Sequence, residues 1–191
     1  MNLIEGKSIL ITGGVGSVGR VLVERCLEEN PAVVRVLDVD ETGLFNLRAQ
    51  LDDDRLRYLV GDVRDPDRLE LAMRDVDVVF HAAALKHVEL SEYNPFEAVK
   101  TNVLGTQHVI ETAIDAGAKR VLLTSSDKAV DPANTMGTTK LLAEKLVTAA
   151  NSYSGGRPTR FAAVRFGNVL HSSRSVLPVF TAQLRAGGPL T

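Results

Sequence analysis

Residues 8–19 read Ser-Ile-Leu-Ile-Thr-Gly-Gly-Val-Gly-Ser-Val-Gly, and this stretch decides the fold. Its first part, Ser8–Thr12, is a short apolar run of the kind that forms a buried strand. Glycines follow at Gly13, Gly16 and Gly19, where the spacing becomes helical. They permit a tight turn after the strand and close packing of the helix on it. The stretch therefore predicts a strand, a glycine-rich loop and a helix in direct succession.

The same loop predicts a dinucleotide-binding site. Its glycines let the backbone approach a pyrophosphate, which would face the positive end of the helix dipole. We expect the contacts to come from Gly13, Gly16, Ser17, Val18 and Gly19. A structural turn is the alternative, but the strand before the loop and the helix after it favour binding.

Apolar runs and amphipathic stretches alternate along the rest of the chain. The further predicted strands are Val33–Asp38, Arg57–Val60, Val76–His81, Arg120–Thr124 and Phe161–Phe166. The predicted helices are Gly19–Glu29, Thr42–Leu51, Pro66–Arg74, Asn94–Ala116, Met136–Ser152 and Phe180–Ala186. Because parallel strands need crossover helices, this alternation predicts an α/β fold with a doubly wound parallel sheet, the Rossmann fold.

The composition excludes several classes of protein. The 191 residues carry a net charge of −2, and no dense run of lysine and arginine indicates a nucleic-acid surface. The single Cys26 excludes a disulfide framework and favours a reducing compartment. No signal peptide or membrane-spanning run is visible, so we expect a cytoplasmic protein.

Two carboxylates follow predicted strands. Asp38 can accept both ribose hydroxyls of an adenosine and would repel a 2′-phosphate, which favours NAD, although the nearby Arg35 and Arg48 leave NADP open. Asp62, with Val63 beside it, can meet the adenine amino group. As an alternative, Asp62 caps the next helix, and the residues leave both roles open.

Charged and hydroxyl side chains gather after the fifth predicted strand. Ser126, Asp127 and Lys128 stand at its carboxyl end, and Lys140 lies on the helix that follows. The edge of the sheet is where such a fold places its chemistry. An exposed Asp-Lys turn and a lysine on a solvated helix face are the alternatives, and the placement favours function. No part of the pattern calls for a metal ion.

Longer motifs give the chain a family resemblance. The glycine loop, the run His81-Ala82-Ala83-Ala84 and the Lys140 helix resemble the extended short-chain dehydrogenase/reductase superfamily. A finer set resembles the polysaccharide-biosynthesis (CapD-like) nucleoside-diphosphate-sugar 4,6-dehydratases, of which UDP-N-acetylglucosamine 4,6-dehydratase is typical. That set is Ala83–Val88, Asn94-Pro95, Lys100-Thr101-Asn102, Ser126–Ala129 and Arg165–Val169.

The resemblance implies a reaction that is redox-neutral overall. Hydride leaves C4 of the sugar for the nicotinamide, water is eliminated across C5 and C6, and the hydride returns to C6. UDP-N-acetylglucosamine is the expected substrate and NAD the expected cofactor. A C4 epimerase and a non-catalytic dinucleotide-binding or sensor module are the alternatives.

The resemblance also implies roles at the reacting centre. Asp127 is the expected acid and Lys128 the expected base. Most of the superfamily has a catalytic tyrosine where this chain has Met136, whose thioether has no exchangeable proton. The proton of the C4 hydroxyl would then pass to Asp127, to Ser125 or Ser126, or to water held by Lys140.

The remaining expected contacts are with the cofactor and the sugar nucleotide. Lys140, Ala82, Ala83, Lys86 and Asn102 are expected to contact the cofactor. Lys86 and His87 are also expected at the sugar or diphosphate, together with Asn168 and Ser175.

Relatives in this family imply more than one domain and more than one copy. We expect residues 1–191 to form an NAD(P)-binding Rossmann domain, with a substrate-binding lobe that starts near residue 167 and is cut short at residue 191. Weak or no turnover is expected of this piece alone. Helices 94–116 and 136–152 are the expected homo-oligomer interface.

Overall fold

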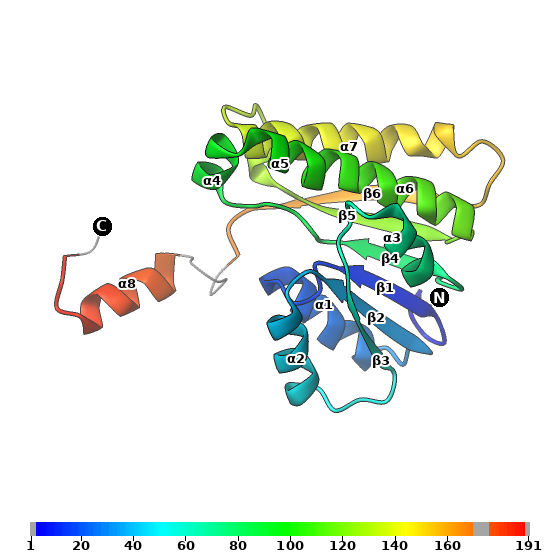
Figure 1. The fold of residues 1–191 in the computed structure, drawn as a ribbon, viewed down its shortest axis with the longest axis horizontal. Coiled ribbons are helices and arrows are strands. Elements are labelled where there is room, and N and C mark those ends of the chain that lie inside the picture. The colour runs from blue at the N-terminus through cyan, green and yellow to red at the C-terminus, as the bar shows by residue number, and fades with distance from the viewer. Residues whose placement is uncertain (1–2, 170–175, 190–191) are drawn as a thin grey trace.

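The computed structural model describes residues 3–169 and 176–189. Within them, six parallel strands form one sheet in the order β3-β2-β1-β4-β5-β6 (Figure 1). The strands are β1 (Ser8–Thr12), β2 (Val33–Asp38), β3 (Leu56–Val60), β4 (Val78–His81), β5 (Arg120–Ser126) and β6 (Arg160–Phe166). The chain runs outward from β1 to β3 and returns to place β4 on the other side of β1. This confirms the predicted doubly wound sheet. Ligands of such sheets bind where the order of the strands reverses, which here is between β1 and β4.

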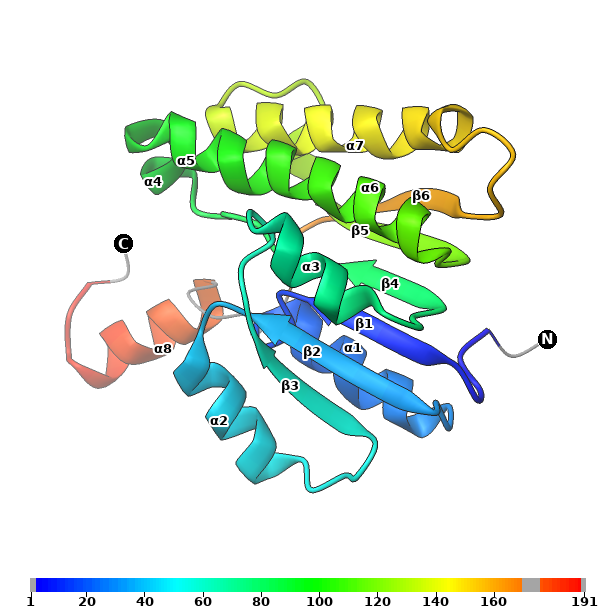
Figure 2. The ribbon, with the colours of Figure 1, turned by 45° about the vertical axis from the view of Figure 1, so that its right-hand side comes forward.

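Helices cover both faces of the sheet (Figure 2). Helices α1 (Ser17–Glu28) and α2 (Glu41–Gln50) pack on one face. Helices α3 (Pro66–Met73), α6 (Gly105–Ala116) and α7 (Thr135–Tyr153) pack on the other. Each face therefore has its own apolar core, and the strands between them need apolar side chains in both directions.

Strand β1 meets this demand at every central position. Ile9 and Ile11 pack with side chains of α1 and α2, whereas Leu10 packs with side chains of α3 and α6. All three are completely buried. Burial of a side chain of this size stabilises the fold by about 1.5–3 kcal/mol. The unbroken apolar run in the sequence is thus the mark of a strand buried on both faces.

The region predicted as one helix, Asn94–Ala116, is divided in the structure. Helix α5 (Pro95–Val99) passes through a π-helical segment, Lys100–Leu104, into α6. The helical spacing of apolar residues does not distinguish a π-turn from an α-turn. Such segments occur often at functional sites, and this one carries Asn102.

Three further short elements complete the described part. Helix α4 (Val88–Tyr93), which the sequence pattern did not indicate, precedes α5, and a 3₁₀ turn covers Asp127–Ala129. Helix α8 (Val176–Arg185) confirms the helix predicted at Phe180–Ala186 and begins earlier. None of the helices in the described part combines the length and apolar character needed to cross a membrane.

Gly19 gives a direct test of how closely α1 packs on the loop that precedes it. A Cβ at this position would overlap the carbonyl oxygen of Gly13 and lie 2.7 Å from Cα of Gly14. We expect Gly19→Ala to lower the free energy of unfolding by about 1–3 kcal/mol, measured by urea denaturation. The control Gly156→Ala, where a Cβ would meet nothing within 4 Å, should change it by less than about 0.5 kcal/mol. An equal effect of both changes would contradict the close packing.

Candidate functional site

A cavity of about 900 Å³ lies at the carboxyl ends of the strands. Its walls come from the glycine-rich loop, the ends of β2 and β3, the loop after β4, the end of β5, the start of α7 and the segment after β6. The predicted residues among them are Gly13, Gly16, Ser17, Val18, Gly19, Asp38, Asp62, Val63, Ala82, Ala83, Lys86, His87, Ser126, Lys128, Met136, Lys140 and Asn168. The fold thus gathers most of the predicted site around one cavity.

The glycine-rich loop leaves no room for side chains on its inner side. Gly13 has φ +69°, and a Cβ there would lie 2.5 Å from the backbone nitrogen of Ala83. Helix α1 begins at Ser17, and its N-cap Gly16 makes no side-chain capping bond. The positive end of the α1 dipole therefore faces the cavity, as a pyrophosphate requires.

The carboxylate of Asp38 is held at the end of β2 by the same loop. Its Oδ2 accepts from the backbone N–H of Val15 at 3.1 Å and its Oδ1 from that of Asp40 at 3.1 Å. Arg35, which the sequence left open as a partner for a 2′-phosphate, instead donates to the carbonyl oxygen of Ala72 on α3. Neither Arg35 nor Arg48 is among the cavity residues in the described part of the chain. This arrangement fits unphosphorylated ribose hydroxyls.

Asp62 lies at the cavity after β3. The alternative in which it caps the next helix is wrong, because Asp65 is the N-cap of α3 and accepts from the N–H of Arg68 at 3.1 Å. Asp62 instead accepts hydrogen bonds from the backbone and side chain of Arg64. Its carboxylate is thus left beside the cavity with Val63.

Ser126, Asp127, Lys128 and Asn168 form one hydrogen-bonded group. Ser126 Oγ donates to Asp127 Oδ1 at 2.8 Å, while Lys128 Nζ lies 3.3 Å from that oxygen and 3.4 Å from Asn168 Oδ1. Hydrogen bonds from Ser126 and Lys128 lower the pKa of Asp127. Asp127 is therefore a carboxylate at neutral pH. Its side chain is half exposed and lies beside the cavity wall rather than in it.

Lys140 is buried, which excludes the solvated helix face. Only 6% of its surface is exposed, and Nζ donates to the carbonyl oxygen of Thr124 at 2.7 Å. Burial lowers the pKa of Lys140 to about 8, although the nearby Glu144 opposes this change. Met136, one turn earlier, is 4% exposed and also lines the cavity. The position of the usual tyrosine thus faces the site as an apolar surface.

Asn102 lies behind the cavity wall rather than in it. Its Oδ1 accepts from the N–H of Leu85 at 2.8 Å, and its Nδ2 donates to the carbonyl oxygen of Leu85 and to Thr139 Oγ1, each at 3.0 Å. Thr139 Oγ1 in turn donates to the carbonyl oxygen of Met136 at 2.8 Å. Asn102 therefore joins the loop after β4 to the first turn of α7.

His81 is held neutral in a fixed tautomer. Thr106 Oγ1 donates to the carbonyl oxygen of Asn102 at 2.7 Å, so it can only accept from His81 Nε2, which lies 3.1 Å away. His81 Nδ1 is then the acceptor for Thr12 Oγ1 at 2.7 Å. Burial, with the charge of Lys140, lowers the pKa of His81 to about 3. The ring joins β1, β4 and α6 without carrying charge.

Several residues in or beside the candidate site had no part in the sequence-based prediction. Glu144, one turn after Lys140, is buried and forms a bidentate ion pair with Arg165 of β6, at 2.6–3.0 Å. Gly137 lies so close to the 3₁₀ turn that a Cβ would overlap the carbonyl oxygen of Lys128. Arg64 and Glu97 line the cavity. The spacing of Glu144 four residues after Lys140 is the one signal that could have revealed any of them.

Ser175, predicted to contact the substrate, lies outside the described residues.

Residues 9–191 match the polysaccharide biosynthesis protein family. The chain belongs to this family. A UDP-N-acetylglucosamine 4,6-dehydratase (inverting) of Campylobacter jejuni is 45% identical over 97% of the chain and 56% of its own length. This confirms the resemblance to the extended short-chain dehydrogenase/reductases of polysaccharide biosynthesis.

Other relatives in the family carry different names. An uncharacterised membrane protein of Methanocaldococcus jannaschii is 56% identical over 100% of the chain and 57% of its own length. A UDP-glucose 4-epimerase of Rickettsia prowazekii is 40% identical over 97% of the chain and 55% of its own length. The chain spans little more than half the length of each of these three curated relatives.

Solved structures share the fold closely. Pen from Bacillus thuringiensis has a TM-score of 0.94 and 46% identity, over 97% of this chain and 59% of that one. DesIV of Streptomyces venezuelae, a dTDP-glucose 4,6-dehydratase solved with NAD bound, has a TM-score of 0.83 and 29% identity, over 96% of this chain and 63% of that one.

Because Lys140 is buried, we expect the free energy of unfolding to rise with pH in the alkaline range. Its pKa is about 8 in the folded protein and 10.5 for a free lysine, so the unfolded state binds more protons between these values. The free energy of unfolding of the wild type should therefore rise relative to Lys140→Met between pH 8 and pH 10.5, by about 3 kcal/mol.

Urea denaturation at a series of pH values measures this difference. The control Lys145→Met removes an exposed lysine from the same helix and should follow the wild-type curve. A constant difference between wild type and Lys140→Met would show that Lys140 keeps its proton throughout this range.

Proposed function

We propose that the protein containing this chain is a nucleoside-diphosphate-sugar 4,6-dehydratase that acts on UDP-N-acetylglucosamine and retains NAD during turnover. The observation that carries the proposal is the hydrogen-bonded group of Ser126, Asp127, Lys128 and Asn168 beside the cavity. It supplies an acid–base pair at the carboxyl end of β5, on the same edge of the sheet as the glycine-rich loop. The Campylobacter relative with a dehydratase name supports the same reaction.

The cavity suits a dinucleotide such as NAD. The glycine-rich loop would hold the pyrophosphate, because Gly16, Ser17 and Val18 line the cavity at the N-terminus of α1. Asp38 would accept the ribose hydroxyls, and Lys140 would bind the nicotinamide ribose. NAD held by these residues would supply the hydride acceptor for C4 of the sugar and the hydride donor for C6.

Proton transfer at O4 needs a route that avoids Met136. Ser126 Oγ already donates to Asp127 Oδ1 at 2.8 Å. A C4 hydroxyl beside Ser126 could therefore pass its proton through the serine hydroxyl to the ionised Asp127. Asp127 would then hold the proton that the departing C6 oxygen needs. Lys128, as the free amine, would take the proton from C5 and give it back to C5 when the hydride is added at C6. One carboxylate thus serves first as acceptor and then as acid, and the protons balance.

The location and assembly belong to the same proposal. We place the protein in the cytoplasm, where nucleotide sugars and NAD occur together. Helices α5, α6 and α7 lie side by side (Figure 1). Phe96 on α5, Leu104 in the π-helical segment and Leu142 on α7 are exposed. This supports a homo-oligomer formed through residues 94–116 and 136–152.

A C4 epimerase is the second candidate, because the Rickettsia relative has that name. It shares the withdrawal of hydride from C4 and omits the elimination. The Asp127-Lys128 pair favours dehydration, since epimerisation has no leaving oxygen to protonate.

Product mass separates the candidates. The full-length protein with UDP-N-acetylglucosamine should give a product that has lost one water, detected by mass spectrometry. An isomer of unchanged mass would indicate an epimerase. No product despite bound NAD would indicate a non-catalytic module and would refute the proposed function.

Asp127→Asn tests the acid–base assignment. The amide can neither accept the proton from Ser126 nor deliver one to the leaving oxygen, so kcat should fall about 10²–10⁴-fold. Asp131→Asn is the matched control: this exposed residue has φ +46°, a conformation that asparagine also tolerates, and kcat should not change. Undiminished turnover of Asp127→Asn would show that another group moves these protons.

A further inference from the structure

Arg64 holds the carboxylate of Asp62 in one orientation. The backbone N–H of Arg64 donates to Asp62 Oδ1 at 2.9 Å, and Nε donates to Oδ2 at 2.7 Å. Nη2 of the same guanidinium lies 2.5 Å from Oδ2. All three donors come from one residue, so the carboxylate cannot turn without breaking all of them.

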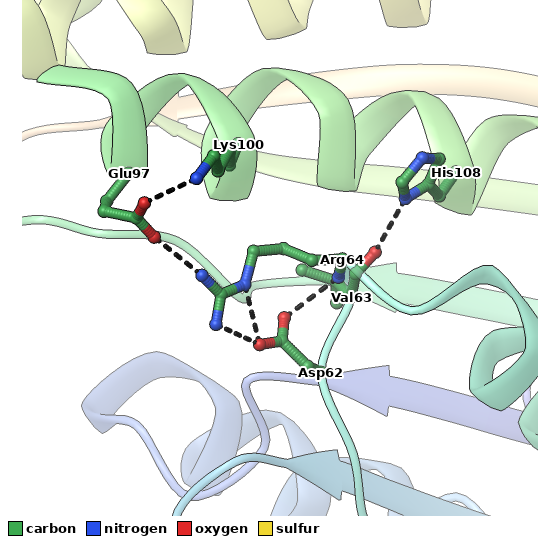
Figure 3. A network of polar contacts seen from close by, with 6 residues as sticks. All are labelled: Asp62, Val63, Arg64, Glu97, Lys100 and His108. Atoms are coloured by element: carbon green, nitrogen blue, oxygen red, sulfur yellow. Dashed lines mark hydrogen bonds and ion pairs between the residues drawn. The ribbon is translucent and has the colours of Figure 1, made fainter.

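A second carboxylate holds the guanidinium from its other side (Figure 3). Nη1 of Arg64 donates to Glu97 Oε2 at 2.8 Å, and Lys100 Nζ donates to Glu97 Oε1 at 2.8 Å. Arg64 follows β3, whereas Glu97 lies on α5, and both line the cavity. The guanidinium therefore ties the loop after β3 to α5 at this end of the cavity.

The contacts leave Asp62 able to bind one more donor. Burial raises the pKa of Asp62, but the hydrogen bonds from Arg64 outweigh it, and the net pKa is lowered. The group is thus an anion that only accepts hydrogen bonds. Oδ2 receives two donors from the side chain of Arg64, whereas Oδ1 receives only the backbone N–H. Oδ1 keeps a lone pair, and Asp62 lines the cavity.

We propose that Arg64 is a positioning residue that makes the adenine end of the cavity specific for a purine with a 6-amino group. By fixing Asp62, it presents an acceptor to that amino group and sets a negative oxygen against any purine that carries an oxygen at position 6. The inference rests on the dinucleotide site of the proposed function and adds a base specificity to it. It does not depend on which sugar reaction follows.

The expected change in affinity follows from the hydrogen bond between Asp62 and the amino group of adenine. A hydrogen bond to a charged group, or a buried polar group left without its partner, changes affinity by about tenfold or more. In Arg64→Met both side-chain donors to Oδ2 would be lost and only the backbone N–H at position 64 would still bind Oδ1, so the Asp62 carboxylate could turn about this one bond. Arg64→Met should thus weaken NAD more than nicotinamide hypoxanthine dinucleotide, which has an oxygen in place of the amino group.

The experiment measures the dissociation constants of both dinucleotides by calorimetry with the full-length protein. The wild type should bind NAD about tenfold more tightly than the hypoxanthine analogue. In Arg64→Met the ratio should fall close to one. The control Arg25→Met removes an arginine from an exposed ion pair with Glu28 on α1, and it should keep the wild-type ratio.

A second variant covers the case in which Arg64→Met does not fold. Glu97→Gln leaves every contact between Arg64 and Asp62 in place and removes only the charge that holds the guanidinium from α5. In this variant the preference for NAD over nicotinamide hypoxanthine dinucleotide should fall by about two- to threefold, the modest effect expected of an exposed ion pair.

The outcomes separate the inference from its alternatives. A drop in affinity that is equal for the two dinucleotides would mean that Arg64 only shapes the loop, and it would overturn the inference. Equal binding by the wild type, or binding of neither dinucleotide, would also overturn it. A normal ratio that is lost in Arg64→Met, together with no dehydrated product, would refute the proposed function and leave this inference standing.

Discussion

The site depends on one close approach between two backbones. Gly13, at the end of β1, lies against the backbone of Ala82 and Ala83 after β4, with no space for a Cβ between them. This contact brings the glycine-rich loop and the loop after β4 together between β1 and β4, where the order of the strands reverses. Any side chain at Gly13 would separate the two walls of the cavity, so the sequence must place glycine here.

A chain of hydrogen bonds extends this contact to the far wall. Thr12 next to Gly13 bonds to His81, His81 to Thr106, and Thr106 to the backbone of Asn102. Asn102 then reaches the first turn of α7 through Thr139 and so fixes the region of Met136 and Lys140. Every group in this buried chain has a partner, which stiffens the site because breaking one bond leaves a buried polar atom unsatisfied. The end of β1 and the start of α7 are therefore held in a fixed arrangement.

The sequence predicts the fold and most of the cavity wall because both rest on local patterns. Each strand is a continuous apolar run, and a parallel sheet brings the residues after its strands to one edge. This is why Asp38, Asp62 and Lys128 could be placed from the sequence. The division of 94–116 and the position of Asn102 behind the wall could not be, because they depend on the loop after β4 that Asn102 contacts.

Ion pairs between residues far apart in the sequence could not be predicted either. Arg64 pairs with Glu97, 33 residues away, and Glu144 with Arg165, 21 residues away. Charged residues are common on helix surfaces, so no spacing rule selects these pairs. The family resemblance supplied the roles of Asp127 and Lys128. The structure added the hydrogen bond from Ser126 to Asp127, on which the proposed proton route is based.

Asn102 also satisfies the backbone beyond the end of β4. Beyond His81 the strand β4 has ended, and the backbone of Leu85 still has an N–H and a C=O to satisfy. The amide of Asn102 accepts from one and donates to the other, the same exchange that two residues make across a ladder. The Asn102 side chain thus makes the hydrogen bonds to Leu85 that a residue of a neighbouring strand would make. It lets the sheet open at the cavity while the backbone of Leu85 remains paired.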